Sequence, residues 1–133
     1  MRIDVVFLTL TVIVLKSYLS LAQTKINASQ IRLIERNHQL CLDTGVNGLS
    51  CTIKYYYQIN DLLNFAFENR MSTLNDQEKS KLNREQYLWL KSRNLKFKSI
   101  DTSNKMPGKD GDMIRLNEKA DFLKKRALKV VSN

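Results

Sequence analysis

The sequence has 133 residues, which is less than the ~150 residues of a typical domain and argues against an enzyme with separate cofactor and substrate domains. Four glycines, one proline and 43% apolar residues argue against collagen-like or disordered chains. They also argue against a β-sandwich, which needs turn residues every ~8–12 positions. The formal net charge of +9 indicates an anionic partner or environment.

The start of the chain, residues 1–22, has the pattern of a secretory signal peptide. Arg2 precedes an apolar run over 5–15, and small residues occupy the −3 and −1 positions of a cleavage site before Gln23. A membrane anchor would need ~20 apolar residues, and Lys16 interrupts the run too early. No cysteine near the cleavage site is present to accept lipid. We therefore expect a soluble, non-lipidated periplasmic or secreted product.

The mature chain, residues 23–133, is expected to be a single all-α domain, a small bundle of about four helices. The first helix is predicted over 27–42, with Ile31, Ile34 and Leu42 among its inward side chains. It ends at a corner rich in Asp, Thr, Asn and Gly, residues that favour turns.

Cys41 and Cys51 flank this corner. In an oxidising compartment a nearby pair of cysteines persists as a disulfide, so we expect the two to form a bridge that pins the corner. The two cysteines and the single His38 match no familiar zinc spacing. We therefore expect no metal or other cofactor, and a solvent-facing histidine near a helix end.

A second helix is predicted over 51–71, where apolar residues such as Ile59 and Leu63 recur at helical spacing. Asn75 and the acidic residues after it then supply a helix start, and we expect a third helix to reach about residue 100. Residues 101–112 contain Pro107-Gly108 and Gly111 and predict a polar loop.

The last helix is predicted over 113–131. It places a regular apolar stripe on one face, with basic residues outside it. The stripe is formed by Leu116, Ala120, Leu123, Ala127 and Val130.

The third predicted helix carries an unusual face that mixes Trp89 with Gln86 and Arg93. With Leu82, Leu90 and Phe97, these residues share one side of a helix at about 100° per residue. The face is either part of the core, with its polar groups hydrogen-bonded, or a recognition surface.

Four short motifs lie within about residues 40–130. The first is the pair Cys41 and Cys51. The second follows Asp-x-x-Leu-Asn-x-x-Tyr, and the third follows Leu-x-x-x-Gln-x-x-Trp-(Leu/Ile)-x-x-Arg-(Asp/Asn). Near the end, Arg126 and Val130 look like Arg-x-x-x-Leu. The residues on the second and third motifs are Asn60, Leu63, Asn64, Phe67, Leu82, Gln86, Trp89, Leu90, Arg93 and Asn94. Together the motifs resemble the N-terminal domain of the LprI-type lysozyme inhibitor family.

The chain departs from the family pattern at several positions. Asn60 and Phe67 replace the more usual Asp and Tyr. Phe97 occupies the place of a family cysteine, and residues 118–121 supply no partner for it. The resemblance implies an exported helical domain of the bacterial envelope whose namesake inhibits lysozyme.

Charge is divided unevenly along the mature chain. Residues 23–78 carry a net charge of −1, and residues 79–133 carry +9. A basic patch on the last two helices would bind an anionic envelope polymer or a membrane surface, unless it is simply a solvated helix face. The predicted patch consists of Lys91, Lys96, Lys98, Lys124, Lys125, Arg126 and Lys129.

The leading functional hypothesis is an envelope binding module that acts on a protein partner, with a lysozyme-type glycosidase as the target to test. Because egg-white-type lysozymes are basic, the contact would fall on the near-neutral half, around Asp43, Asp61 and Glu68. The alternative is binding of an anionic polymer or membrane. We expect no specific nucleic-acid partner. We also expect that the protein is not an enzyme, because the sequence has no nucleophile–histidine arrangement and no phosphate-binding glycine loop.

Overall fold

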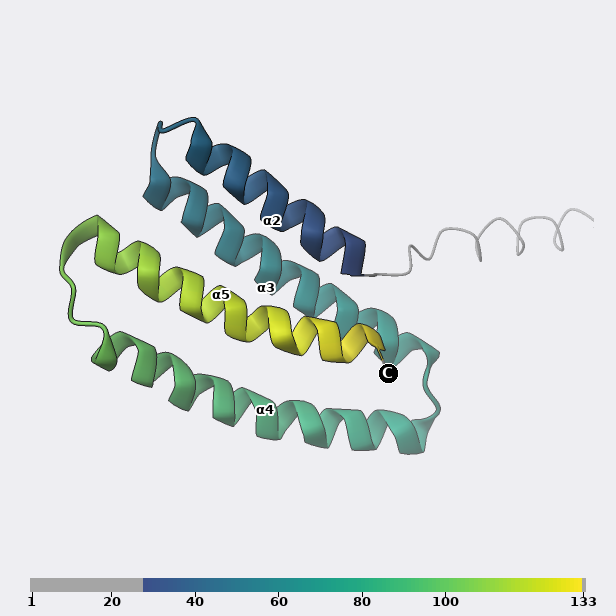
Figure 1. The fold of residues 1–133 in the computed structure, drawn as a ribbon. Coiled ribbons are helices and arrows are strands. Elements are labelled where there is room, and N and C mark those ends of the chain that lie inside the picture. The colour runs from purple at the N-terminus through teal and green to yellow at the C-terminus, as the bar shows by residue number, and fades with distance from the viewer. Residues whose placement is uncertain (1–27, 133) are drawn as a thin grey trace, which may run out of the picture.

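Four helices make up residues 28–132, the part of the chain that the computed structural model describes (Figure 1). In chain order they are α2 (Ala28–Asp43), α3 (Gly48–Thr73), α4 (Asp76–Ser103) and α5 (Gly108–Ser132), and no strand occurs within these residues. The predicted all-α bundle with a disulfide-pinned corner is thereby confirmed. The predicted signal peptide lies outside the described residues.

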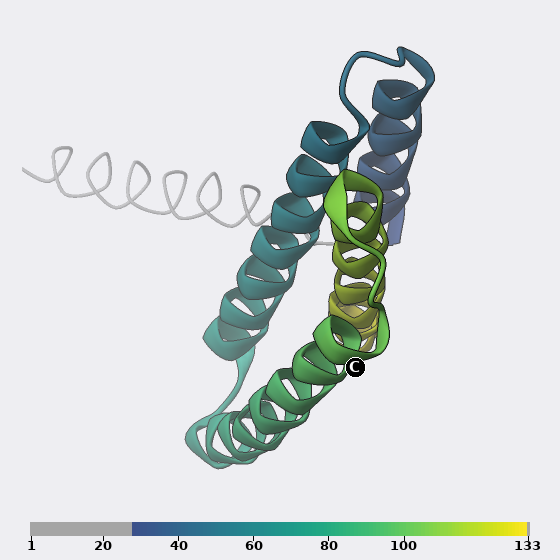
Figure 2. The ribbon, with the colours of Figure 1, turned by 90° about the vertical axis from the view of Figure 1, so that its left-hand side faces the viewer.

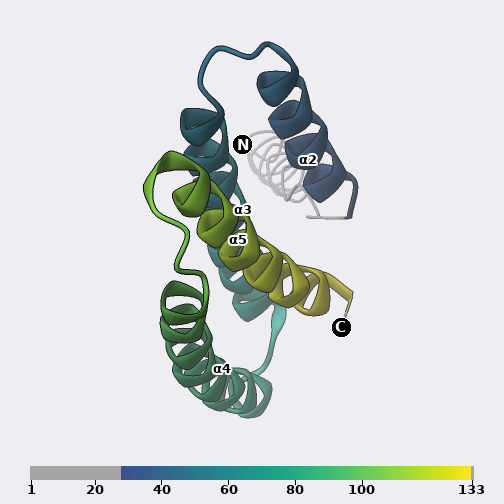
Figure 3. The ribbon, with the colours of Figure 1, turned by 60° about the vertical axis from the view of Figure 1, so that its left-hand side comes forward.

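Helices α3 and α5 form the central pair, although they are not consecutive in the chain. Contacts at both ends show that they run in the same direction. Gly48 at the start of α3 lies against Met113 near the start of α5. At the other end, Arg70 of α3 donates a hydrogen bond of 3.2 Å to the carbonyl oxygen of Val130. Helices α2 and α4 lie on opposite sides of this pair in all three ribbon views (Figures 1, 2 and 3).

The core is built from the apolar stripes of α3 and α5. The predicted α5 stripe is buried except at Leu116, which is half-buried, and it meets the stripe of α3. Ile31 of α2 adds to this cluster. Helix α4 contributes mainly half-buried side chains, and its two buried residues are Leu82 and Ile100. The buried cluster therefore joins α2, α3 and α5, and α4 packs on its edge. The buried members in α3 and α5 are Tyr55, Ile59, Leu63, Ala66, Ala120, Leu123, Ala127 and Val130.

The disulfide between Cys41 and Cys51 joins α2 to α3, with the two Cα atoms 5.8 Å apart. The second helix was predicted to begin near Cys51, but α3 begins at Gly48. The reason is that the Asn47 side chain accepts a hydrogen bond from the backbone N–H of Ser50 at 3.1 Å, which satisfies a free donor of the first turn.

The expectation for His38 is wrong. It lies within α2 and is half-buried, and its ring stacks on Tyr55 with 4.4 Å between ring centroids. Burial lowers the pKa of His38, because the charged imidazolium loses hydration there.

The loop predicted over 101–112 is much shorter, because α4 continues to Ser103 and α5 begins at Gly108. The chain folds back so closely that a Cβ atom on Gly111 would overlap the carbonyl of Met106. Arg115 then donates hydrogen bonds of 3.0 Å to the carbonyl oxygens of Asn104 and Met106. Gly111 is therefore a close-packing residue within a helix and not a loop residue.

Candidate binding surface on helix α4

The Gln86 and Trp89 side of α4 packs against α5. Gln86 accepts a hydrogen bond of 2.9 Å from Nη2 of Arg126. The Trp89 ring stacks on Phe122, with 5.9 Å between centroids and 13° between the planes. Both side chains are half-buried. This face therefore holds α4 to the rest of the protein.

Arg126 was predicted to belong to a surface basic patch, but only 7% of it is exposed. Its guanidinium lies 5.6 Å from the centre of the Trp89 ring. Its Nε has no hydrogen-bond partner in the described part of the chain. Burial lowers the pKa of Arg126, and the charge is partly compensated by the ring and by Gln86. Arg126 is thus a packing residue and not a surface cation.

The family-motif residues are Asn64, Gln86, Trp89 and Arg93, and only Asn64 lies apart from the others. Arg93 is half-buried beside the rings of Trp89 and Phe97, at 5.7 and 5.9 Å, and donates to the Asn94 side chain. Asn64 is exposed on α3. The fold therefore keeps Gln86, Trp89 and Arg93 together on α4 and leaves Asn64 outside this group.

Phe97, at the position of a family cysteine, contacts α5 through aromatic and cationic groups. Its ring lies 6.3 Å from that of Phe122, and Lys119 lies over it at 5.4 Å. Lys119 also pairs with Asp101 of α4 at 2.6 Å. These contacts connect α4 and α5 at the position where members of the LprI-type family are expected to have a second disulfide.

The predicted basic patch is divided by the fold. Lys124 forms ion pairs with Glu35 of α2 at 2.8 Å and with Asp121 at 3.0 Å. Burial acts to lower the pKa of Lys124, but the hydrogen bonds to the two carboxylates outweigh it and raise the pKa above its ordinary value. Lys125 and Lys129 are exposed on α5. The remaining members, Lys91, Lys96 and Lys98, are exposed on α4.

A different surface emerges on the side of α4 that faces away from α5. We call it the α4 outer face. At 3.6 residues per turn its members fall within about 100° of arc and extend over about 21 Å. All six are exposed, and α4 has no acidic residue between Gln86 and Ile100. The members of the face are Arg84, Tyr87, Leu88, Lys91, Leu95 and Lys98.

Lys91 and Lys98 were predicted as members of the basic patch, whereas Arg84, Tyr87, Leu88 and Leu95 were not predicted. The available signal was a seven-residue repeat: basic residues recur at 84, 91 and 98, and leucine at 88 and 95. Among the described residues, none of the three cations of this face forms an ion pair. Lys91 lies over the Tyr87 ring at 4.5 Å.

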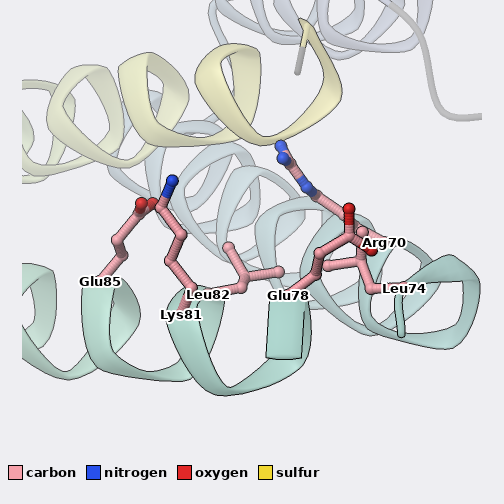
Figure 4. A pocket seen from close by; sticks show the side chains of 6 residues that line it. All are labelled: Arg70, Leu74, Glu78, Lys81, Leu82 and Glu85. Atoms are coloured by element: carbon pink, nitrogen blue, oxygen red, sulfur yellow. The ribbon is translucent and has the colours of Figure 1, made fainter. Parts of the chain in front are cut away.

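A pocket of about 270 Å³ lies where the end of α3 meets the start of α4 (Figure 4). Its charged side chains are already engaged or balanced: Glu78 accepts from the backbone N–H of Asn75, and Arg70 donates to Val130. Lys81 and Glu85 have opposite charges. This pocket therefore offers no concentrated charge or reactive group.

Within residues 28–132, no group of three His, Cys, Asp or Glu side chains is placed to hold a metal ion. None of the described helices combines the length and apolar character needed to cross a bilayer.

Comparison with protein-family models, with curated proteins and with solved structures finds no match for this chain. The resemblance to the LprI-type domain therefore remains an interpretation of the sequence motifs.

Proposed function

We propose that this protein is an exported binding protein that attaches to anionic surfaces through the α4 outer face. The observation that carries the proposal is the row of cations Arg84, Lys91 and Lys98 on one side of a single helix, none of which forms an ion pair among the described residues. A row of cations that is not neutralised by ion pairs creates a local positive potential that attracts anions. The net charge of +8 on residues 23–133 adds long-range attraction.

A charge-matched pair of variants tests this proposal. Lys91→Gln/Lys98→Gln removes two charges from the α4 outer face, and Lys125→Gln/Lys129→Gln removes two exposed charges from α5. On an immobilised heparin column we expect the α4 variant to elute at clearly lower salt than the wild type. The α5 variant should elute close to the wild type, because its two lysines are on another helix and do not belong to the α4 outer face.

Equal shifts for the two variants would contradict the proposal, because they would show that retention depends on net charge and not on this face. Circular dichroism of both variants provides the folding control. We expect no change, since all four lysines are exposed.

A second candidate is inhibition of a lysozyme-type glycosidase, and a specific surface favours it. Asp61 and Glu68 are exposed on α3 with Asn64 of the family-like motif, and the exposed rings of Tyr57 and Phe65 lie beside them. Acidic and aromatic groups suit a basic protein partner. If this candidate is correct, Asp61→Asn/Glu68→Gln weakens inhibition of egg-white-type lysozyme and Lys91→Gln/Lys98→Gln does not. Absence of inhibition by the wild type would eliminate it.

A further inference from the structure

We propose that the anionic surface recognised by the α4 outer face is a lipid bilayer, with Leu88 and Leu95 entering the headgroup region. This inference rests on the proposed function and adds the class of ligand. Its basis is the apolar half of the face, which charge attraction alone leaves without a role.

The apolar members of the face are each more than half exposed. Tyr87 is 57% exposed, Leu88 58% and Leu95 71%. Leu88 and Leu95 are seven residues apart, so they lie on the same side of α4 about 10 Å from each other. A dissolved polyanion is charged along its whole length and offers these side chains no apolar environment. A bilayer offers anionic headgroups and, directly beneath them, hydrocarbon.

The order of residues along the face suits such an interface. Each leucine is flanked one helical turn away by a cation: Arg84 and Lys91 beside Leu88, Lys91 and Lys98 beside Leu95. Long basic side chains can keep their charge among phosphates while their carbon stems lie along apolar groups. Tyrosine is enriched at the headgroup level because its ring is apolar and its hydroxyl is polar.

The position of α4 in the fold allows contact along its whole length. It lies on the edge of the molecule, and α2, α3 and α5 are all on its other side (Figures 2 and 3). The opposite side of α4, with Trp89 and Gln86, packs on α5. A planar surface can therefore meet the outer face over about 21 Å without clashing with another described helix.

The chain provides a matched control for the leucines. Leu33 and Leu40 of α2 are also seven residues apart and are 57% and 54% exposed. We compare Leu88→Gln/Leu95→Gln with Leu33→Gln/Leu40→Gln, because glutamine keeps the helix propensity close to that of leucine. The assay is co-sedimentation with vesicles of phosphatidylglycerol and phosphatidylcholine in equal parts, beside pure phosphatidylcholine vesicles.

We expect the wild type to bind the anionic vesicles and not the neutral ones. The α4 leucine variant should bind about tenfold more weakly or worse, which corresponds to ~1.4 kcal/mol. Its retention on heparin should be unchanged, and the α2 variant should behave as the wild type in both assays. Fluorescence of Trp89, the single tryptophan, checks that α4 remains packed on α5 in both variants.

Other outcomes distinguish a failure of the bilayer inference from a failure of the proposed function. Binding to heparin without binding to anionic vesicles overturns the bilayer inference and leaves the proposed function standing. Failure to bind either one overturns both. Vesicle binding that is insensitive to the α4 leucine substitutions, or equally reduced in the α2 variant, also overturns the inference. If the protein binds heparin but not anionic vesicles, an acidic helix of a protein partner becomes the occupant that fits the exposed leucines.

Discussion

The contact between Trp89 and α5 leads to a quantitative prediction for Trp89→Ala. Truncation of a fully buried tryptophan costs about 3–5 kcal/mol. Trp89 is only partly buried, so loss of its burial should cost less than that, ~2 kcal/mol. Loss of the stack on Phe122 and of the contacts with Arg93 and Arg126 should add ~1 kcal/mol. We therefore expect the free energy of unfolding to fall by about 3 kcal/mol, a large part of the stability of a small domain.

Urea denaturation followed by circular dichroism measures this loss. Leu95→Ala is the control, because Leu95 is on the same helix and is 71% exposed. The control should change stability by less than about 0.5 kcal/mol. Amide hydrogen exchange adds a local test, since in Trp89→Ala it should rise more over α4 than over the core segment of α3. If Trp89→Ala is no more destabilising than Leu95→Ala, the packing of α4 on α5 described here is incorrect.

Four further predictions rest on the sequence or on the structure. Arg93→Ala should lower the free energy of unfolding by less than about 1 kcal/mol in thermal melting, because Arg93 is partly exposed and its hydrogen bonds within the described residues go to its neighbour Asn94; a loss similar to that of Trp89→Ala would contradict this. Reduction of the disulfide should cost about 2–3 kcal/mol without loss of helical circular dichroism, because the bridge closes a short loop; complete unfolding on reduction would show that the helical core is weaker than described. Because the pKa of His38 is lowered in the fold, the unfolded chain binds a proton at this histidine more readily than the folded protein does. The melting temperature should therefore fall as the pH is lowered from about 8 to about 5.5. His38→Gln, which leaves no histidine, should remove most of that dependence, and an identical pH profile in this variant would refute the assignment. Finally, intact mass of secreted material should show a chain that starts at Gln23 with two hydrogens fewer than the reduced form, and two alkylatable thiols would contradict this.

The sequence was sufficient to predict the helical class, the disulfide-pinned corner and the apolar stripes, because these follow from local spacing. Ile59 and Leu63 lie on the predicted stripe and are buried. The stripe does not specify its partner, however, and nothing in local spacing indicates that α3 pairs in parallel with α5. The length of the last loop was wrong because Gly111, a typical loop residue, is required here for close packing against Met106.

The candidate site was predicted only in part, for a similar reason. A count of basic residues treats Lys91, Lys124 and Arg126 alike. The structure distinguishes them by tertiary partners: Lys124 meets Glu35, 89 residues away in the sequence, and Arg126 is buried beneath Trp89. Lys91 has no such acidic partner within the described residues. Which cations remain free is therefore a property of the fold and not of the charge pattern.

The parallel course of α3 and α5 gives the helix between them a second role, that of a spacer of fixed length. The chain must return from the end of α3 to the start of α5, and the 28 residues of α4 cover about 42 Å at 1.5 Å per residue. Loss of a single residue would shift the later contacts by that rise and rotate them by about 100°. Asp101 would then no longer face Lys119 while Gln86 faced Arg126. Sequence drift on the exposed side of α4 is thus compatible with the fold, whereas insertions and deletions belong in the loops.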